Sequence, residues 1–192
     1  MHHIGTVAIE TKRLLLRRFT EVDATPAFRN WTSDEKVTEF LRWPTHQSVE
    51  ITERVLKEWV AGYARDDFYQ WAIVLKEQGD EPLGTISVVG QNETLHSMHI
   101  GYCIGSKWWG QGITSEAFAA IIPVLFDEVK VNRIESQHDP RNPGSGKVMT
   151  KCGLRYEGTL READFSNCGI VDAAMYSLLA REYRAAIKMQ AE

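Results

Sequence analysis

The sequence contains few cysteines, no dense cluster of basic residues and no long apolar segment. Its three cysteines, Cys103, Cys152 and Cys168, are odd in number and form no Cys-x-x-Cys pair. This pattern argues against a disulfide framework or a zinc site and favours free thiols in a reducing compartment. No apolar run reaches membrane-spanning length, and the first residues lack the basic and apolar regions of a secretory signal. These absences predict a cytoplasmic protein without a membrane partner.

The charge and composition narrow the class of protein further. A net charge of −4 without a Lys/Arg-rich run argues against nucleic acid as a direct partner. The chain of 192 residues is 43% apolar and 25% charged, which is typical of a globular protein with a sizeable core. No internal repeat, low-complexity linker or compositional break divides it. We therefore expect one α+β domain spanning residues 1–192.

Apolar periodicity and turn-forming residues predict a mixture of strands and helices. Strands are expected at residues 7–19, 71–75, 83–89, 95–104, 133–138, 154–165 and 171–179. Helices are expected at residues 23–31, 34–41, 48–63, 114–129 and 144–152. Pro123 lies inside the fourth of these helices, so this helix should be kinked or divided into two pieces.

The stretch from residue 102 to residue 117 is the most informative part of the chain. It has the pattern of a strand end, a glycine turn and the first turn of a helix, for which Thr114 and Ser115 are suitable N-caps. Gly110 and Gly112 allow the backbone to bend sharply and to approach a ligand closely. Free N–H groups at a helix N-terminus attract phosphate. The stretch therefore predicts a site for a phosphate-bearing cofactor at residues 107–115.

Two common phosphate-binding motifs do not fit. A Walker loop around Gly146-Lys147 would need Gly at position 141 and Ser or Thr at position 148, where the chain has Arg141 and Val148. A dinucleotide-binding fingerprint would need a third glycine at position 115, where the chain has Ser115.

A third pattern does fit. Lys107-x-x-Gly110-x-Gly112 resembles the acetyl-CoA loop of the GNAT acetyltransferase superfamily, with Lys107 replacing the usual Gln or Arg. Residues 142–154 resemble the family's Asn-x-x-Ser…Lys-x-Gly-Phe segment, and residues 100–104 its Ile-Gly-Tyr strand. The opening residues 11–17 and the closing residues 172–176 are typical of the RimJ/RimL-like branch, the ribosomal-protein N-terminal acetyltransferases. The resemblance implies a mixed, mostly antiparallel central sheet that is splayed at the acetyl-CoA site and flanked by helices.

The resemblance also implies a cofactor and a reaction. Acetyl-CoA is the expected acetyl donor. The expected acceptor is a primary amine, in particular a protein or peptide N-terminal α-amine. This amine is expected to attack the acetyl group directly in a ternary complex. A small-molecule amine and a non-catalytic acyl-CoA-binding module are the alternatives. The protein is expected to act as a monomer or a homodimer. The implied acetyl-CoA contacts are Tyr102, Cys103, Ile104, Lys107, Trp108, Trp109, Gly110, Gln111, Gly112, Ile113, Thr114, Asn142 and Ser145.

The catalytic residues are less sharply defined. Many GNAT enzymes use a Tyr as the general acid at the position where this chain has Met149. The resemblance therefore implies Ser145 as the general acid of this chain. Alternatively, Ser145 only caps a helix. For the general base, Asp164 aligns best with the acidic residue of the branch. His99 is the other candidate for the general base. The alternative interpretation of His99 is a polar residue on the solvent face of its strand. Trp43 is the candidate for contact with the acceptor.

Overall fold

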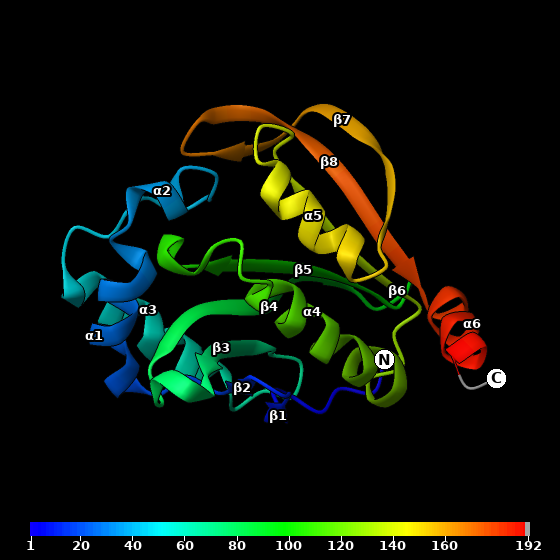
Figure 1. Ribbon diagram of the computed structural model, residues 1–192, viewed down its shortest axis with the longest axis horizontal. Helices are drawn as coiled ribbons and strands as arrows, with labels where there is room; N and C mark the ends of the chain where they lie inside the picture. The colour runs from blue at the N-terminus through cyan, green and yellow to red at the C-terminus, as the bar shows by residue number, and fades with distance from the viewer. Residues whose placement is uncertain (191–192) are drawn as a thin grey trace.

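The computed structural model describes residues 1–190, which are built around one eight-stranded sheet (Figure 1). The strands lie in the order β1-β2-β3-β4-β5-β6-β8-β7, and every neighbouring pair is antiparallel except β5 and β6. The strands are β1 (Ile9–Glu10), β2 (Leu14–Arg17), β3 (Gln70–Leu75), β4 (Pro82–Asn92), β5 (Ser97–Ile104), β6 (Arg133–His138), β7 (Arg155–Ser166) and β8 (Gly169–Leu179). This is the mixed, mostly antiparallel sheet that the sequence predicts.

Helices cover both faces of the sheet and give it two apolar cores (Figure 1). The larger core lies between the sheet and α4, and the smaller one packs α1 and α3 against the other face around Ala72. Among residues 1–190, no helix is both long and apolar enough to cross a membrane. The helices are α1 (Ala24–Ala27), α2 (Glu35–Thr38), α3 (Val49–Gly62), α4 (Ile113–Pro123), α5 (Pro143–Lys151) and α6 (Ala180–Gln190).

Several element boundaries differ from those expected. The strand predicted at residues 7–19 is two short strands, and α1 and α2 are shorter than the helices predicted at residues 23–31 and 34–41. The helix predicted at residues 114–129 is divided, because α4 ends at Pro123 and a π-helical turn follows at Val124–Glu128. Helix α6 has no counterpart among the predicted elements.

The central feature of the sheet is a gap between β5 and β6. These parallel strands are paired only as far as His99 opposite Glu135. Beyond that point β5 continues beside β4 to Ile104, whereas β6 continues beside β8 to His138. The sheet is therefore splayed, as predicted, and residues 101–104 have a backbone edge without a partner strand on the β6 side.

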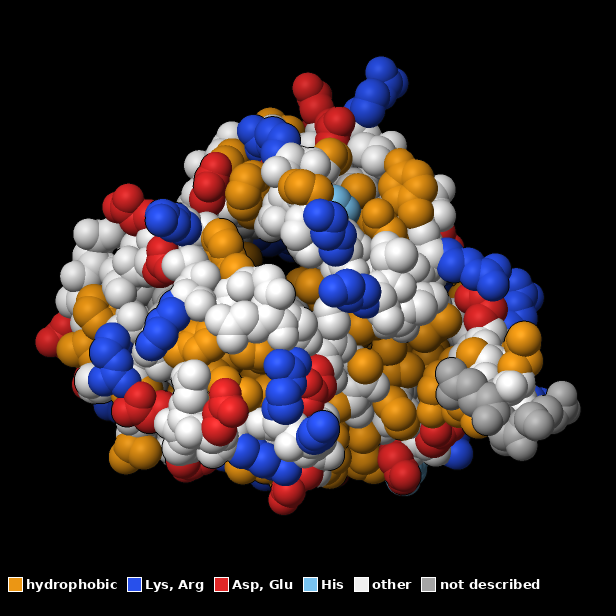
Figure 2. Space-filling model, in the orientation of Figure 1, with side chains coloured by type: hydrophobic (Ala, Val, Ile, Leu, Met, Phe, Trp, Pro, Cys, Tyr) orange, Lys and Arg blue, Asp and Glu red, His pale blue; other side chains and the backbone are white. Residues whose placement is uncertain are grey.

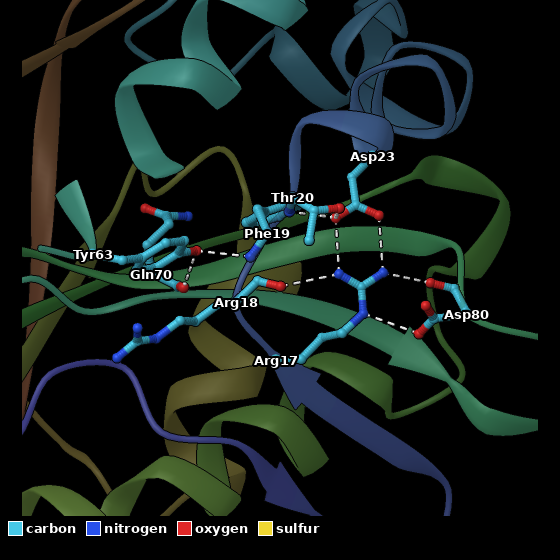
Figure 3. Close-up of polar contacts among 8 residues, drawn as sticks. All are labelled: Arg17, Arg18, Phe19, Thr20, Asp23, Tyr63, Gln70 and Asp80. Carbon is cyan, nitrogen blue, oxygen red and sulfur yellow. Dashed lines mark hydrogen bonds and ion pairs between the residues drawn. The ribbon is translucent and has the colours of Figure 1, made fainter. Parts of the chain in front are cut away.

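Arg17, at the end of β2, connects the sheet to the segment that begins α1 (Figure 3). Its Nη1 and Nη2 donate to the two carboxylate oxygens of Asp23 at 2.8 and 2.9 Å, and its Nε donates to Asp80 at 3.0 Å. Asp23 is only 4% exposed and also accepts the backbone N–H of Thr20. Without Arg17 this carboxylate would be buried with too few partners.

We therefore expect Arg17→Met to lower the free energy of unfolding by about 3 kcal/mol, because breaking one side of a buried ion pair leaves an uncompensated charge. Urea denaturation measures the loss. Arg29→Met is the matched control, since the pair of Arg29 with Glu81 is exposed on both sides and should contribute less than about 1 kcal/mol. Equal losses in the two variants would contradict a special role for Arg17.

Tyr63, which follows α3, connects the segment after β2 to the first residue of β3 (Figure 3). Its hydroxyl accepts the backbone N–H of Phe19 and donates to the backbone carbonyl of Gln70, both at 2.8 Å. Burial raises the pKa of this hydroxyl to about 12, so it remains a donor over the physiological range. The first residue of β3 is therefore held in place from outside the sheet.

Candidate active site

The glycine turn forms a cradle of free backbone N–H groups. Gly110 and Gly112 have φ angles of 75° and 74°, a left-handed conformation that favours glycine. Gly112 is the N-cap of α4, so Thr114 and Ser115, expected as caps, lie in the first helical turn instead. The N–H groups of residues 110–112 donate to no backbone carbonyl within the described chain. Together with the first turn of α4, they form a site suited to phosphate.

A cavity of about 380 Å³, here called the loop cavity, lies against this turn. The space-filling view in Figure 2 shows a hollow in the surface with Lys and Arg side chains beside it. Lys147 and Lys151 of α5 line the loop cavity one helical turn apart and bring positive charge to it. Neither lysine was among the acetyl-CoA contacts expected from the sequence, although Lys151 belongs to the Asn-x-x-Ser…Lys-x-Gly-Phe segment. The cavity therefore combines N–H donors with two cations, which fits the pyrophosphate and phosphate groups of CoA.

The remaining predicted loop residues have distinct positions. Trp108 lines the loop cavity but is buried, and its indole donates to Gln78 at 3.1 Å. The indole of Trp109 donates to the carbonyl of Ile104 at 3.0 Å, so this carbonyl already has a partner. Lys107 lies over the Trp108 ring, and neither Lys107 nor Gln111 is in the cavity lining. Ile113 and Thr114 do line it, as do Gly110 and Gly112.

A second cavity, of about 700 Å³, opens on the other face of the sheet and is here called the hairpin cavity. Strands β3, β4, β5 and β6 form its floor, Trp59 of α3 lines one wall, and Phe165 of the β7–β8 hairpin lines another. Trp43, the predicted acceptor contact, is in the lining, and its ring lies 5.2 Å from that of His46.

The roof of the hairpin cavity joins two segments that are far apart in sequence. The Asn167 side chain donates to the carbonyls of Thr38 and Trp43 at 2.8 Å, and its backbone N–H donates to Leu41 at 3.0 Å. Arg42 pairs with Asp164 at 2.6 Å. The hairpin tip is thereby fixed to the segment after α2, and Figure 1 shows the tip of β7 and β8 beside α2.

The two cavities meet at the free edge of β5. They share Phe40, Leu41, Tyr102, Cys103, Asn142 and Ser145. Asn142 is the N-cap of α5 and accepts the backbone N–H of Ser145, so the alternative that Ser145 caps this helix is wrong. The Ser145 hydroxyl instead lies 3.0 Å from the Tyr102 hydroxyl, which also donates to the Ser145 carbonyl at 2.8 Å. Burial raises the pKa of Tyr102, so its hydroxyl remains protonated.

Cys103 also lies at the junction of the cavities. Burial raises the pKa of its thiol to about 12. A thiol with this pKa is protonated at neutral pH and is therefore a poor nucleophile. Cys103 consequently lines the junction without competing with an acceptor for an acyl group.

The two candidate bases have different surroundings. His99 lines the hairpin cavity with its Nδ1 3.7 Å from Glu135, and burial lowers its pKa, so it is neutral near pH 7. Asp164 is engaged by three donors, namely Arg42, the side chain of Gln137 and the backbone N–H of Phe165. Within residues 1–190, no three His, Cys, Asp or Glu side chains gather as a metal site would require.

Comparison with known proteins agrees with this geometry. Residues 13–155 match the acetyltransferase (GNAT) domain family. An uncharacterized N-acetyltransferase p20 of Bacillus licheniformis is 30% identical over 177 residues, covering 90% of this chain and 96% of that protein. The ribosomal-protein-serine acetyltransferase of Escherichia coli is 30% identical over 138 residues, covering 71% of this chain and 75% of that protein.

A solved structure shares the fold. RimL, a ribosomal L7/L12 α-N-protein acetyltransferase in complex with coenzyme A, superposes with a TM-score of 0.80 at 20% identity, covering 92% of this chain and 99% of that one. The extent of the family match and of the similarity to the Bacillus protein establishes the relationship. The chain belongs to the GNAT family and is an acetyl-CoA-dependent N-acetyltransferase.

Proposed function

We propose that the protein acetylates the N-terminal α-amine of a protein or peptide. The main observation behind this proposal is the pair of cavities that approach the free edge of β5 from opposite faces and share Tyr102, Cys103, Asn142 and Ser145. The loop cavity suits a CoA donor, and the hairpin cavity is in the size range of sites for ligands of several hundred daltons. The relationship to a ribosomal-protein-serine acetyltransferase supports a protein N-terminus as the acceptor.

The cradle at residues 110–114, together with Lys147 and Lys151, would hold the phosphates of acetyl-CoA. Bound acetyl-CoA supplies the acetyl group that is transferred. The free edge of β5 at Tyr102 and Cys103 would hold the pantetheine arm by backbone hydrogen bonds and provide an N–H for the oxyanion. Asn142 would contact the arm from the α5 side.

Ser145 would act as the general acid, and the neighbouring Tyr102 hydroxyl would support it by hydrogen bonding. When Ser145 gives its proton toward the leaving sulfur, the Tyr102 O–H, 3.0 Å from the Ser145 hydroxyl, would donate a hydrogen bond to the serine oxygen, which then regains its proton from water. Because the pKa of Tyr102 is raised, the tyrosine carries a proton over the working range. This pair would replace the acidic tyrosine that is absent at the position of Met149, whose own side chain is fully buried.

His99 would act as the general base and Asp164 as a positioning residue. His99 faces the hairpin cavity in neutral form and can accept the acceptor's proton. The carboxylate of Asp164 already accepts from three donors and connects the hairpin to Arg42 and Gln137. We therefore assign Asp164 to the roof of the cavity.

The acceptor class can be tested by measuring CoA release with acetyl-CoA and a panel of peptides and small amines. A protein N-terminal acetyltransferase should acetylate peptides at the α-amine, and mass spectrometry of the product locates the acetyl group. Turnover with only polyamines, amino acids or antibiotics would favour a small-molecule enzyme.

The pH dependence of kcat distinguishes the two candidate bases. At saturating substrates, kcat of the wild type should fall as the pH falls through the pKa of His99, which burial places below the ordinary 6.5. His99→Gln should lower kcat at neutral pH by about 100-fold and abolish this fall in kcat at acidic pH, here called the acidic limb of the pH profile. Asp164→Asn should retain the limb.

The groups around His99 provide the controls for this experiment. Glu135 and Asp164 raise its pKa, and Arg42 lowers it. Arg42→Gln should therefore shift the limb toward higher pH. If Asp164→Asn removes the limb and His99→Gln leaves it in place, the assignment of the base is wrong.

A further inference from the structure

A row of neutral polar side chains forms part of the floor of the hairpin cavity, outside the catalytic assignments above. Gln70 of β3 and Thr85 and Ser87 of β4 line the cavity and are 6%, 8% and 8% exposed. Apolar residues would normally occupy such positions in a sheet packed against a helix. Buried polar side chains at a cavity surface therefore require a specific reason.

The hydrogen bonds of the row are incomplete. The Gln70 amide nitrogen donates to the Thr85 hydroxyl, which donates to the backbone carbonyl of Trp71 at 3.0 Å. The orientation of the Gln70 amide is thereby fixed, and Tyr63 holds its backbone (Figure 3). The Gln70 side-chain oxygen and the Ser87 hydroxyl have no partner within the described part of the chain. Among the described residues only Trp31 Nε1 is a fully buried side-chain atom without a partner, so the Gln70 oxygen and the Ser87 hydroxyl reach the open cavity and are available to a ligand.

The row lies beside the junction of the two cavities. In the sheet register, Thr85 is opposite Cys103, Ser87 is opposite Gly101, and Gln70 is opposite Ser87. Neighbouring strands are about 5 Å apart, so Ser87 lies about one strand spacing from the free edge of β5 and Gln70 about two. The side chain of an N-terminal residue begins on the carbon that carries the reacting amine. A short side chain on that carbon can therefore reach the row.

The chemistry of the row defines what it can recognise. Gln70 offers an acceptor oxygen, and Ser87 offers a hydroxyl that can donate or accept. None of the three side chains is charged, and a charged ligand group buried against them would lack compensation. The charged residues of the cavity lie elsewhere and already have partners: Arg42 with Asp164, Glu135 with Arg133, and Asp139 with Arg141.

We propose that Gln70, Thr85 and Ser87 form a specificity subsite that selects acceptors whose first residue has a short hydroxyl- or amide-bearing side chain (Ser, Thr or Asn). The inference rests on the proposed α-amine acetylation and names the class of N-terminus accepted. Apolar side chains of the same shape are disfavoured because they leave the Gln70 oxygen and the Ser87 hydroxyl unpaired.

The test compares peptides that are identical except for an N-terminal Thr or Val, which have nearly the same shape. The wild type should show a kcat/KM about ten-fold higher for the Thr peptide, the effect of about one net hydrogen bond. Ser87→Ala and Gln70→Met should each reduce this ratio toward one. Ser177→Ala is the matched control, because Ser177 is a buried serine of β8 that does not line the cavity, and it should retain the ratio.

Thermal unfolding separates recognition from folding. Ser87→Ala removes a hydroxyl that reaches the cavity and has no partner among the described residues, so its Tm should not decrease. A wild type that does not discriminate between the two peptides, or variants that keep the full ratio, would overturn the subsite. If no peptide is acetylated but threoninamide is preferred over valinamide, the peptide acceptor is wrong and the subsite stands. If neither peptides nor these amides are acetylated, both proposals are wrong.

Discussion

Replacing Gly112 with leucine should weaken CoA binding by at least about 100-fold, equivalent to roughly 3 kcal/mol. At φ 74°, Gly112 has a conformation that a leucine adopts only with strain. A Cβ at this position would meet no atom closer than 3.8 Å, so the protein itself leaves room for the side chain. Because Gly112 lines the loop cavity, that side chain would instead occupy the place of the phosphates. Isothermal titration calorimetry with CoA measures the loss.

Gly79→Leu separates this effect from backbone strain. Gly79 has a φ of 90°, with no atom within 4 Å of an added Cβ, and it lies in the connection between β3 and β4. Gly79 has a ψ of −148°, a conformation even less accessible to leucine than that of Gly112, so Gly79→Leu should lose at least as much stability, but only Gly112→Leu should lose CoA affinity. Unchanged affinity in Gly112→Leu would refute the assignment of the phosphate cradle.

Ser145→Ala should lower kcat by about 100-fold, the usual order for removal of a general acid. The affinity for acetyl-CoA should change by less than about three-fold, because backbone groups and lysines provide most of the expected contacts. Rapid-quench or steady-state measurement of CoA release gives kcat, and calorimetry gives the affinity. Thr150 is an exposed residue of the same helix whose hydroxyl donates to the Gly146 carbonyl, and Thr150→Ala should leave kcat unchanged.

Tyr102→Phe tests the second member of the pair. It retains the ring, which lies 5.7 Å from that of Phe118, but removes the hydroxyl next to Ser145. We expect a fall in kcat of about ten-fold, smaller than that of Ser145→Ala, because Ser145 can still give its proton and regain it from water. Near-normal kcat in both variants would show that neither hydroxyl provides the proton.

Much of the fold could be predicted because the signals are local. Strand β6 and the β7–β8 hairpin lie where periodicity and turn residues predict them, and Pro123 marks the division of the fourth predicted helix. Boundaries were less accurate where several residues competed for one role. Thr114 and Ser115 are good N-cap types, but the left-handed turn at Gly112 begins α4 before them. Likewise, Asn142 caps α5 and leaves the Ser145 hydroxyl available.

The sequence by itself determined the glycine turn that we propose binds acetyl-CoA, because glycine spacing, a preceding strand and a following helix are encoded within a few residues of one another. Tertiary structure alone decided which side chains meet. Tyr102 reaches Ser145 across 43 residues, and Asn167 closes the cavity roof onto Thr38 across 129. The polar row beside Cys103 depends on the register of β3, β4 and β5. Such contacts depend on which segments the whole sheet brings together and on where it splays, and residues within one short segment do not decide this.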